Sequence, residues 1–102
     1  MRIRFTAHAV VDLERAHDYY AQIDPELGER FLADVDAAVE RLEMFPAGAP
    51  PVEGFDEMRR ARMRHLPYGV FYRCSDTETE LLVIRVLHSR RHHPDILEHP
   101  GS

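Results

Sequence analysis

The chain has 102 residues, of which 44% are hydrophobic and 30% charged, with a formal net charge of −5. This length has room for one hydrophobic core, so we expect a single domain over residues 1–102. No apolar run approaches the roughly 20 residues that span a bilayer, and the first six residues lack the apolar stretch of a signal peptide. We therefore expect a cytoplasmic protein without membrane association. Cys74 is the single cysteine, which excludes an internal disulfide.

The first predicted elements are a strand and a helix. Ile3 and Phe5 alternate with arginines, which is typical of a short strand with one buried face. Thr6 is suited to cap a helix over residues 7–23, in which apolar residues recur at steps of four and three. This stripe consists of Ala9, Leu13, Ala16 and Tyr20, with Val10 beside it.

A second helix is predicted after Asp24 and Pro25, because Asp caps helices and Pro tolerates the first helical position. Its apolar stripe comprises Leu27, Phe31, Val35, Ala38, Leu42 and Phe45. Prolines from Pro46 onward end it. Since one or two residues separate the helices, we expect an antiparallel hairpin.

Three strands follow a loop over residues 47–57, because the hydrophobic period changes to two. We expect them at 58–65, 69–74 and 80–88, with a polar tail from about residue 89. In the last strand, simple alternation places Leu82, Ile84 and Val86 on one face, and Leu81, Val83 and Leu87 on the other with Arg85.

The element order is therefore β-α-α-β-β-β. It predicts an α+β fold, in which a helical hairpin packs on one face of a small, mainly antiparallel, twisted sheet. The other face of the sheet is then available.

Charge is distributed unevenly along the chain. Residues 1–57 hold 5 Arg against 13 acidic residues, a net −8, whereas residues 58–102 hold 8 Arg against 5 acidic residues, a net +3. Arg60, Arg62 and Arg64 lie at period two, so they either bind an acidic partner segment or form a solvated face that discourages edge pairing.

Two further arginines lie inside apolar strands. Arg73 and Arg85 each need an exposed face or a carboxylate partner, such as Glu78 or Glu80. The histidines at 88, 92 and 93 lack the acidic or cysteine companions of known metal sites, so we expect neither a metal nor a cofactor.

Several motifs resemble a known family. Tyr19-Tyr20 closes the first helix, and Phe45-Pro46 ends the second. Residues 66–73 (LPYGVFYR) and 84–91 (IRVLHSRR) are similar to the third and last strands of the RelE/ParE superfamily of bacterial toxins, with the ParE-like branch the better match.

The resemblance implies a toxin that a cognate ParD-like antitoxin neutralises in a hetero-oligomer. ParE toxins act on DNA gyrase, whereas RelE-type toxins cleave messenger RNA on the ribosome. Candidate antitoxin-binding or target-binding residues are Arg60, Arg62, Arg64, Arg73, Arg85, Arg90 and Arg91. Val10, Leu13, Phe31 and Val35 are candidates for an apolar antitoxin seam, with internal core as the alternative.

RNA cleavage needs a base, an acid and cations for the phosphate. The candidates for these roles are Arg62, Arg73, His88, Arg90 and His93, with a structural His88 as the alternative. Against this reading, Gly69 stands where the RelE branch commonly has Arg, and a net charge of −5 opposes approach to a polyanion. We therefore expect a protein-binding, ParE-like toxin. A RelE-like nuclease, an attenuated toxin with another target and a non-toxic interaction module stay open.

Overall fold

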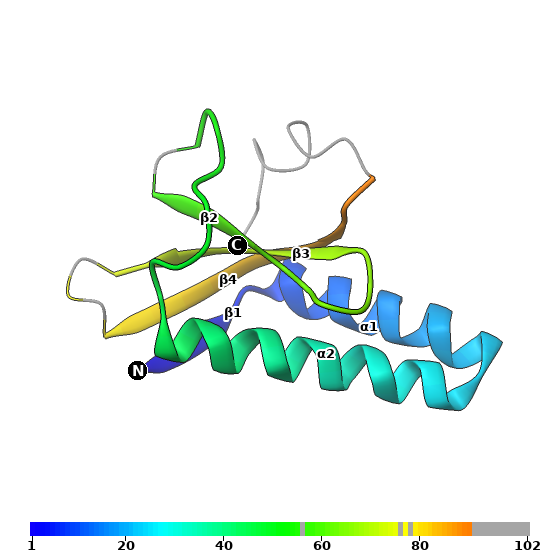
Figure 1. The fold of residues 1–102 in the computed structure, drawn as a ribbon. Coiled ribbons are helices and arrows are strands. Elements are labelled where there is room, and N and C mark those ends of the chain that lie inside the picture. The colour runs from blue at the N-terminus through cyan, green and yellow to red at the C-terminus, as the bar shows by residue number, and fades with distance from the viewer. Residues whose placement is uncertain (56, 76, 78, 91–102) are drawn as a thin grey trace.

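The structure is a computed structural model that describes residues 1–90 except 56, 76 and 78. Its elements are β1 (Arg2–Phe5), α1 (Ala7–Ile23), α2 (Pro25–Met44), β2 (Met58–Arg62), β3 (Tyr68–Cys74) and β4 (Glu80–His88). This order confirms the predicted β-α-α-β-β-β arrangement (Figure 1). β2 ends earlier than predicted, at Arg62, so Arg64 lies in the connection to β3.

Local capping fixes the helical hairpin. The Thr6 hydroxyl accepts a hydrogen bond from the Ala9 amide at 3.0 Å, and the Asp24 carboxylate accepts one from the Glu26 amide at 3.0 Å. Asp24 is the one residue between α1 and α2, which forces the helices to run antiparallel. They pack closely at Gly28, where an added Cβ would lie 3.0 Å from the Cβ of Ala21.

The sheet has the strand order β1-β4-β3-β2. β2, β3 and β4 form an antiparallel meander, whereas β1 pairs in parallel with β4. The hairpin covers one face of this mixed sheet, as predicted (Figure 1). β1 and β2 are therefore the two edge strands.

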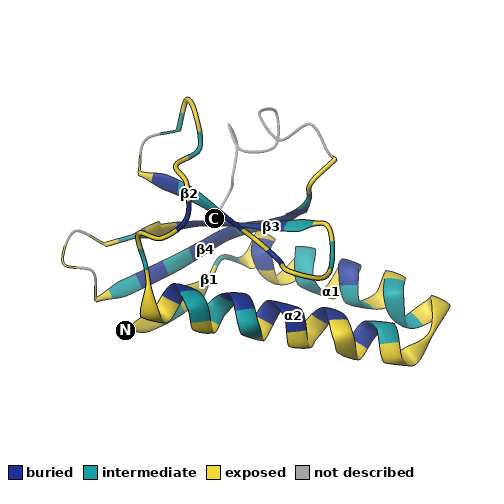
Figure 2. Cartoon of the chain, viewed as in Figure 1, coloured by how far each residue is buried: buried dark blue, intermediate teal, exposed yellow. Residues whose placement is uncertain are grey.

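The buried residues form two clusters, one with members from both helices and one without, so the clusters lie on opposite faces of the sheet. Figure 2 shows buried positions along both helices and along β3 and β4. The helix-side cluster includes Phe31, Ala38 and Tyr72, each fully buried. The outer cluster consists of Met58, Phe71, Ile84 and Leu87, with Val52 and Phe55 from the preceding loop packed against it. The outer face is thus partly occupied by the chain itself, rather than wholly available as predicted.

A β-bulge changes the phase of β4. Phe71 pairs with Arg85 and the next residue, Tyr72, pairs with Val83, so Ile84 is the extra residue. Beyond the bulge, Val86 belongs to the helix-side cluster and Leu87 to the outer cluster. The prediction from simple alternation was wrong for both residues, because it assumed an uninterrupted strand.

Two predicted core residues are exposed. Phe5 is 36% exposed, because β1 is an edge strand, and Phe45 is 65% exposed as the residue that follows the last turn of α2. In the described part of the chain, neither helix combines the length and apolarity needed to cross a bilayer.

Candidate functional site

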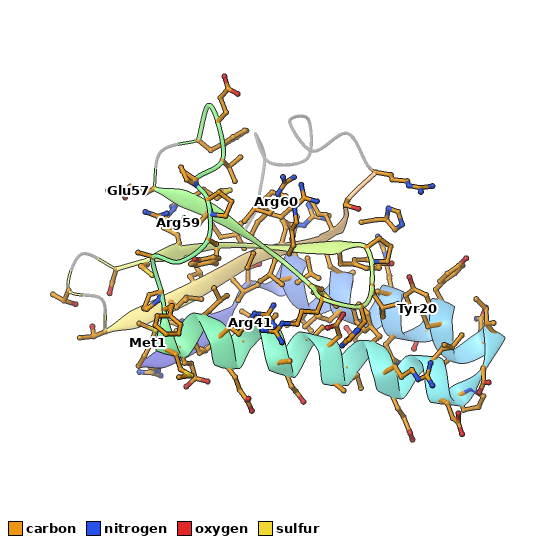
Figure 3. All side chains as sticks on the ribbon, in the orientation of Figure 1. Met1, Tyr20, Arg41, Glu57, Arg59 and Arg60 are labelled. Carbon is orange, nitrogen blue, oxygen red and sulfur yellow. The ribbon has the colours of Figure 1, made fainter. Side chains whose placement is uncertain are left out.

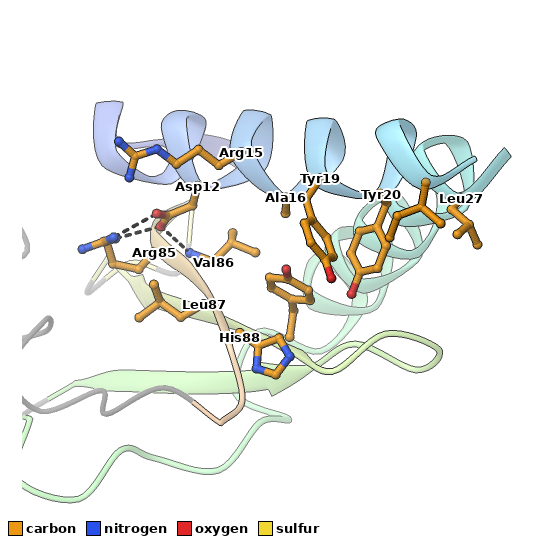
Figure 4. Close-up of a pocket in the computed structure, with 12 residues that line it drawn as sticks. Asp12, Arg15, Ala16, Tyr19, Tyr20, Leu27, Arg85, Val86, Leu87 and His88 are labelled. Atoms are coloured by element: carbon orange, nitrogen blue, oxygen red, sulfur yellow. Dashed lines mark hydrogen bonds and ion pairs between the residues drawn. The ribbon is translucent and has the colours of Figure 1, made fainter. Parts of the chain in front are cut away.

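A buried ion pair joins α1 to the bulge in β4. The Nε and Nη2 of Arg85 donate to the two carboxylate oxygens of Asp12 at 2.7 and 2.8 Å, and the amide of Val86 donates to the same carboxylate at 3.0 Å (Figure 4). The Asp12 side chain is 8% exposed and that of Arg85 16%. The hydrogen bond with Asp12 raises the pKa of Arg85. The carboxylate partner of Arg85 is therefore Asp12. Of the two partners that the sequence suggested, Glu80 pairs with Arg4 instead, and Glu78 falls outside the described residues.

Beside this pair lies a groove of about 390 Å³ between α1 and the end of β4 (Figure 4). We call it the tyrosine groove, and its lining includes Arg15, Tyr19, Tyr20, Ile23, Leu27, Tyr68 and His88. Tyr19 is 60% exposed and Ile23 is 62% exposed, so apolar surface at its rim faces solvent. Such a surface on a small domain is typical of a protein-binding site.

Aromatic packing holds the floor of the tyrosine groove. The Tyr68 ring meets those of Tyr20, Phe31 and His88 edge to face, with centroid separations of 6.2, 5.3 and 5.3 Å. The Nδ1 of His88 accepts a hydrogen bond from the Arg90 amide at 3.1 Å. His88 is thus positioned by aromatic and backbone contacts.

A second buried carboxylate holds the connection between β2 and β3. The Oδ2 of Asp34, on α2, accepts hydrogen bonds from the amides of His65 and Leu66, both at 3.0 Å. Asp34 is 3% exposed, and its Oδ1 has no hydrogen-bond partner among the described residues. α2 thereby fixes the turn that leads into β3.

Sequence reasoning gave Asp12 and Asp34 no structural role, although a signal was present. Asp12 lies three residues after Ala9 and four before Ala16, and Asp34 lies three after Phe31 and four before Ala38. Each acid is therefore in phase with the buried stripe of its helix. A carboxylate at such a position needs buried donors.

The predicted arginine surface is only partly contiguous. By strand alternation, Arg60 and Arg62 share the outer face with Met58, whereas Arg64 is exposed in the β2–β3 connection. Arg73 is exposed at the opposite end of β3. Arg90 is exposed after β4, and Arg91 falls outside the described residues.

The predicted apolar seam is divided between surface and interior. Phe31 is fully buried and Val35 is 6% exposed, so both belong to the core, which was the stated alternative. Leu13 is partly buried against that core. Val10 is 44% exposed, and it is the member of the set with free surface.

The candidate nuclease residues occupy different parts of the sheet. Arg73 on β3 pairs with Met58, which lies four residues before Arg62 on β2. At ~3.3 Å per residue, the backbone positions of Arg62 and Arg73 are therefore about 13 Å apart along the sheet. His88 pairs with Tyr68 on the helix side, opposite to the face that carries Arg62. His93 falls outside the described residues.

Within residues 1–90, apart from the three undescribed positions, no group of three His, Cys, Asp or Glu side chains is arranged to hold a metal ion. His92 and His93 are not part of that description. The charged groups that converge in the tyrosine groove are Arg15 and the Asp12–Arg85 pair, whose charges already neutralise each other.

Comparison with solved structures gives three similar chains. A chromosomal ParDE toxin-antitoxin protein from Pseudomonas aeruginosa aligns with a TM-score of 0.73 at 21% identity, covering 86% of this chain and 95% of the other. A chain of the RelBE2 toxin-antitoxin complex from Mycobacterium tuberculosis gives 0.59 at 25% identity, with coverages of 85% and 95%. The isolated Escherichia coli RelE toxin gives 0.58 at 14% identity, with 96% of each chain covered.

Sequence comparison agrees with the fold. The candidate toxin Y4kP of Sinorhizobium fredii (strain NBRC 101917 / NGR234) is 28% identical over 96 residues, which are 94% of this chain and 96% of the relative. Residues 3–93 match the family described as the ParE toxin of the type II toxin-antitoxin system parDE. With that match running from β1 past the end of β4, the chain belongs to the ParE toxin family.

Proposed function

We propose that this ParE-family toxin is held inactive by a cognate ParD-like antitoxin and that the free toxin inhibits DNA gyrase by binding it. The observation that carries the proposal is the separation of Arg62, Arg73 and His88. A phosphoryl-transfer site needs its acid, base and cations within hydrogen-bond reach of one phosphate. The backbone positions of Arg62 and Arg73 lie about 13 Å apart along the sheet, and His88 lies on the other face. A protein-binding mode makes no such demand.

The tyrosine groove supports the antitoxin part of the proposal. It is open at the margin between α1 and β4, and its rim residues Tyr19 and Ile23 are large, apolar and mostly exposed. Amphipathic helices dock by placing apolar side chains at i, i+3, i+4 and i+7 into grooves of this kind. Arg15 at the same rim would pair with an acidic residue of such a helix.

A pair of assays on the purified chain tests the proposed target. In the first, the chain is added to DNA gyrase with relaxed plasmid and ATP, and we expect loss of supercoiling with accumulation of cut DNA. In the second, it is added to a cell-free translation reaction, and we expect intact transcripts. Reactions without the chain serve as controls.

Cut transcripts together with unaffected gyrase would replace this proposal with the RelE-like alternative. If neither reaction is affected, and expression of the chain alone leaves growth unchanged, the chain acts as an interaction module instead. If a ribbon-helix-helix protein is encoded beside this gene, its co-expression should restore growth, which tests the antitoxin part separately.

A further inference from the structure

A second groove lies away from the tyrosine groove, between the C-terminal end of α2 and the edge of β2 that faces away from β3. It has a volume of about 430 Å³. We call it the α2–β2 groove, and its lining includes Arg41, Leu42, Phe45, Pro50, Arg60 and Arg62. Two elements that are distant in sequence thus combine arginines with apolar side chains.

The backbone of β2 is partly covered along this edge. The carbonyl of Met58 accepts a hydrogen bond from the Val52 amide at 2.8 Å, and the amide of Arg60 donates to the Pro50 carbonyl at 3.1 Å. Further along, the carbonyl of Arg62 accepts a hydrogen bond from the Nη2 of Arg41 at 3.1 Å. Arg41 reaches from α2 toward β2 to make this contact (Figure 3). Such covering protects an edge strand from unwanted pairing.

Two backbone groups remain at the centre of the edge. Because residues alternate along an antiparallel strand, Arg60 and Arg62 direct their amides and carbonyls away from β3. The Arg60 carbonyl and the Arg62 amide have no hydrogen-bond partner among the described residues. An extended segment laid along β2 would satisfy both groups, as in β-strand addition.

The three arginines of the groove favour an acidic occupant. The ion pairs in the described part of the chain are Arg4–Glu80, His17–Asp18 and Arg85–Asp12, so Arg41, Arg60 and Arg62 have no carboxylate partner there. The stem of Arg60 lies across Gly69, where an added Cβ would be 3.0 Å from its Cδ. The absence of a side chain at Gly69 therefore makes room for Arg60. The groove is thus locally basic in a chain whose overall net charge is −5.

Phe45 adds an apolar contact point. It is 65% exposed at the end of α2 and lies in the groove beside the buried Leu42. Covering an exposed aromatic ring with an apolar side chain contributes binding free energy in proportion to the area removed from water. One apolar residue between acidic ones would complement this arrangement.

We propose that the α2–β2 groove binds an extended acidic segment of the cognate antitoxin. Its carboxylates contact Arg41, Arg60 and Arg62, an apolar side chain packs on Phe45, and its backbone pairs with the Arg60 carbonyl and the Arg62 amide. The identity of the partner rests on the proposed function, whereas the chemistry of the segment rests on the groove. Exposed peptide groups at the edge favour a polypeptide over a nucleic acid, and a net charge of −5 disfavours a polyanionic strand.

Fluorescence anisotropy with a labelled eight-residue peptide of alternating Glu and Val tests the groove on the full chain. We expect Arg62→Glu to weaken binding about tenfold or more, since it replaces a charge-assisted contact by repulsion. Arg30→Glu is the matched control, because it makes the same charge change at an exposed position of α2 outside the groove. Equal weakening by both variants would show a purely long-range charge effect and overturn the proposal.

Phe45→Ala is a second variant, and it changes no charge. It should keep the fold, because the Phe45 ring is mostly exposed. We expect it to weaken binding of the same peptide about threefold or more. Unchanged binding by Phe45→Ala and Arg62→Glu, or displacement of the peptide by an oligoribonucleotide of equal charge at lower concentration, would each refute the acidic-peptide site. Growth inhibition by the unaltered chain is scored separately, so failure of the toxin proposal is distinguishable from failure of this one.

Discussion

At the scale of single residues, burial decides how much an ion pair contributes to stability. Arg85 and Asp12 are mostly buried, whereas Arg4 and Glu80 are 59% and 38% exposed. Removing one partner of a buried pair leaves an uncompensated charge and costs about 3–5 kcal/mol. Removing one partner of an exposed pair costs about 1 kcal/mol or less.

The first prediction compares these two pairs. Arg85→Met should lower the free energy of unfolding by about 3 kcal/mol, while Arg4→Met on the edge strand should change it by less than about 1 kcal/mol. Urea denaturation followed by circular dichroism measures both. Similar effects of the two variants would mean that Asp12 finds other donors when Arg85 is removed.

The second prediction concerns alkaline pH. Tyr72 is fully buried and donates a hydrogen bond to the Pro46 carbonyl at 2.6 Å, and burial raises its pKa above the usual value of 10.0. The folded state therefore favours the neutral phenol. The corresponding stability is present below about pH 10, where the phenol of the unfolded chain is also neutral, and is lost as the pH rises above that value.

Tyr72→Phe should lower the free energy of unfolding by about 1 kcal/mol at pH 7, because the Pro46 carbonyl loses its hydroxyl donor and keeps the thiol of Cys74 at 3.9 Å. Above pH 10 the difference from the unaltered chain should shrink, since the variant has no phenol to titrate at this position. Tyr19→Phe, at a side chain that is 60% exposed, is the control. A difference in the free energy of unfolding between the Tyr72 variant and the unaltered chain that stays constant from pH 7 to 11 would contradict a raised pKa of Tyr72.

At the scale of elements, α2 does more than cover the sheet. Asp34 holds the turn before β3 through two amides, so Asp34→Ala should leave both without their acceptor and cost about 2 kcal/mol. Asp36→Ala, at an exposed position of α2, should stay within about 0.5 kcal/mol of the unaltered chain. Thermal unfolding and amide hydrogen exchange at His65 and Leu66 measure the difference. Unchanged exchange at these amides would show that other contacts hold the turn.

The elements themselves could be predicted well where the signals are local. Capping by Thr6 and Asp24 and regular apolar spacing gave the bounds of α1, and the apolar run gave those of β4. The bulge at Ile84 has no comparable local signal, because it depends on the register with β3. That is why alternation placed Val86 and Leu87 on the wrong faces. It is also why Asp12, which accepts a hydrogen bond from the Val86 amide just beyond the bulge, was not recognised as a structural residue.

At the scale of the whole molecule, the layers followed from the element order, but the partners of each strand did not. β1 pairs with β4, whose residues lie 78 positions further along the chain, and no short-range pattern specifies such a pairing. The candidate binding surfaces depend on this assembly. The tyrosine groove needs α1 beside the end of β4, and the α2–β2 groove needs the end of α2 beside an edge strand. Periodicity alone singled out Arg60 and Arg62 as candidates, whereas Arg41 and Phe45 line the α2–β2 groove only through the tertiary fold.

The parallel pairing of β1 with β4 also bears on how the chain is made. During synthesis, residues 2–5 are made long before their partners at 80–83. Until then β1 has no strand to join, and the helical hairpin has no complete sheet to cover. Closing so distant a contact is a late and slow step, because the chain entropy must be lost before the contact forms. The tyrosine groove, which lies between α1 and the end of β4, therefore takes shape only after β4 has been made.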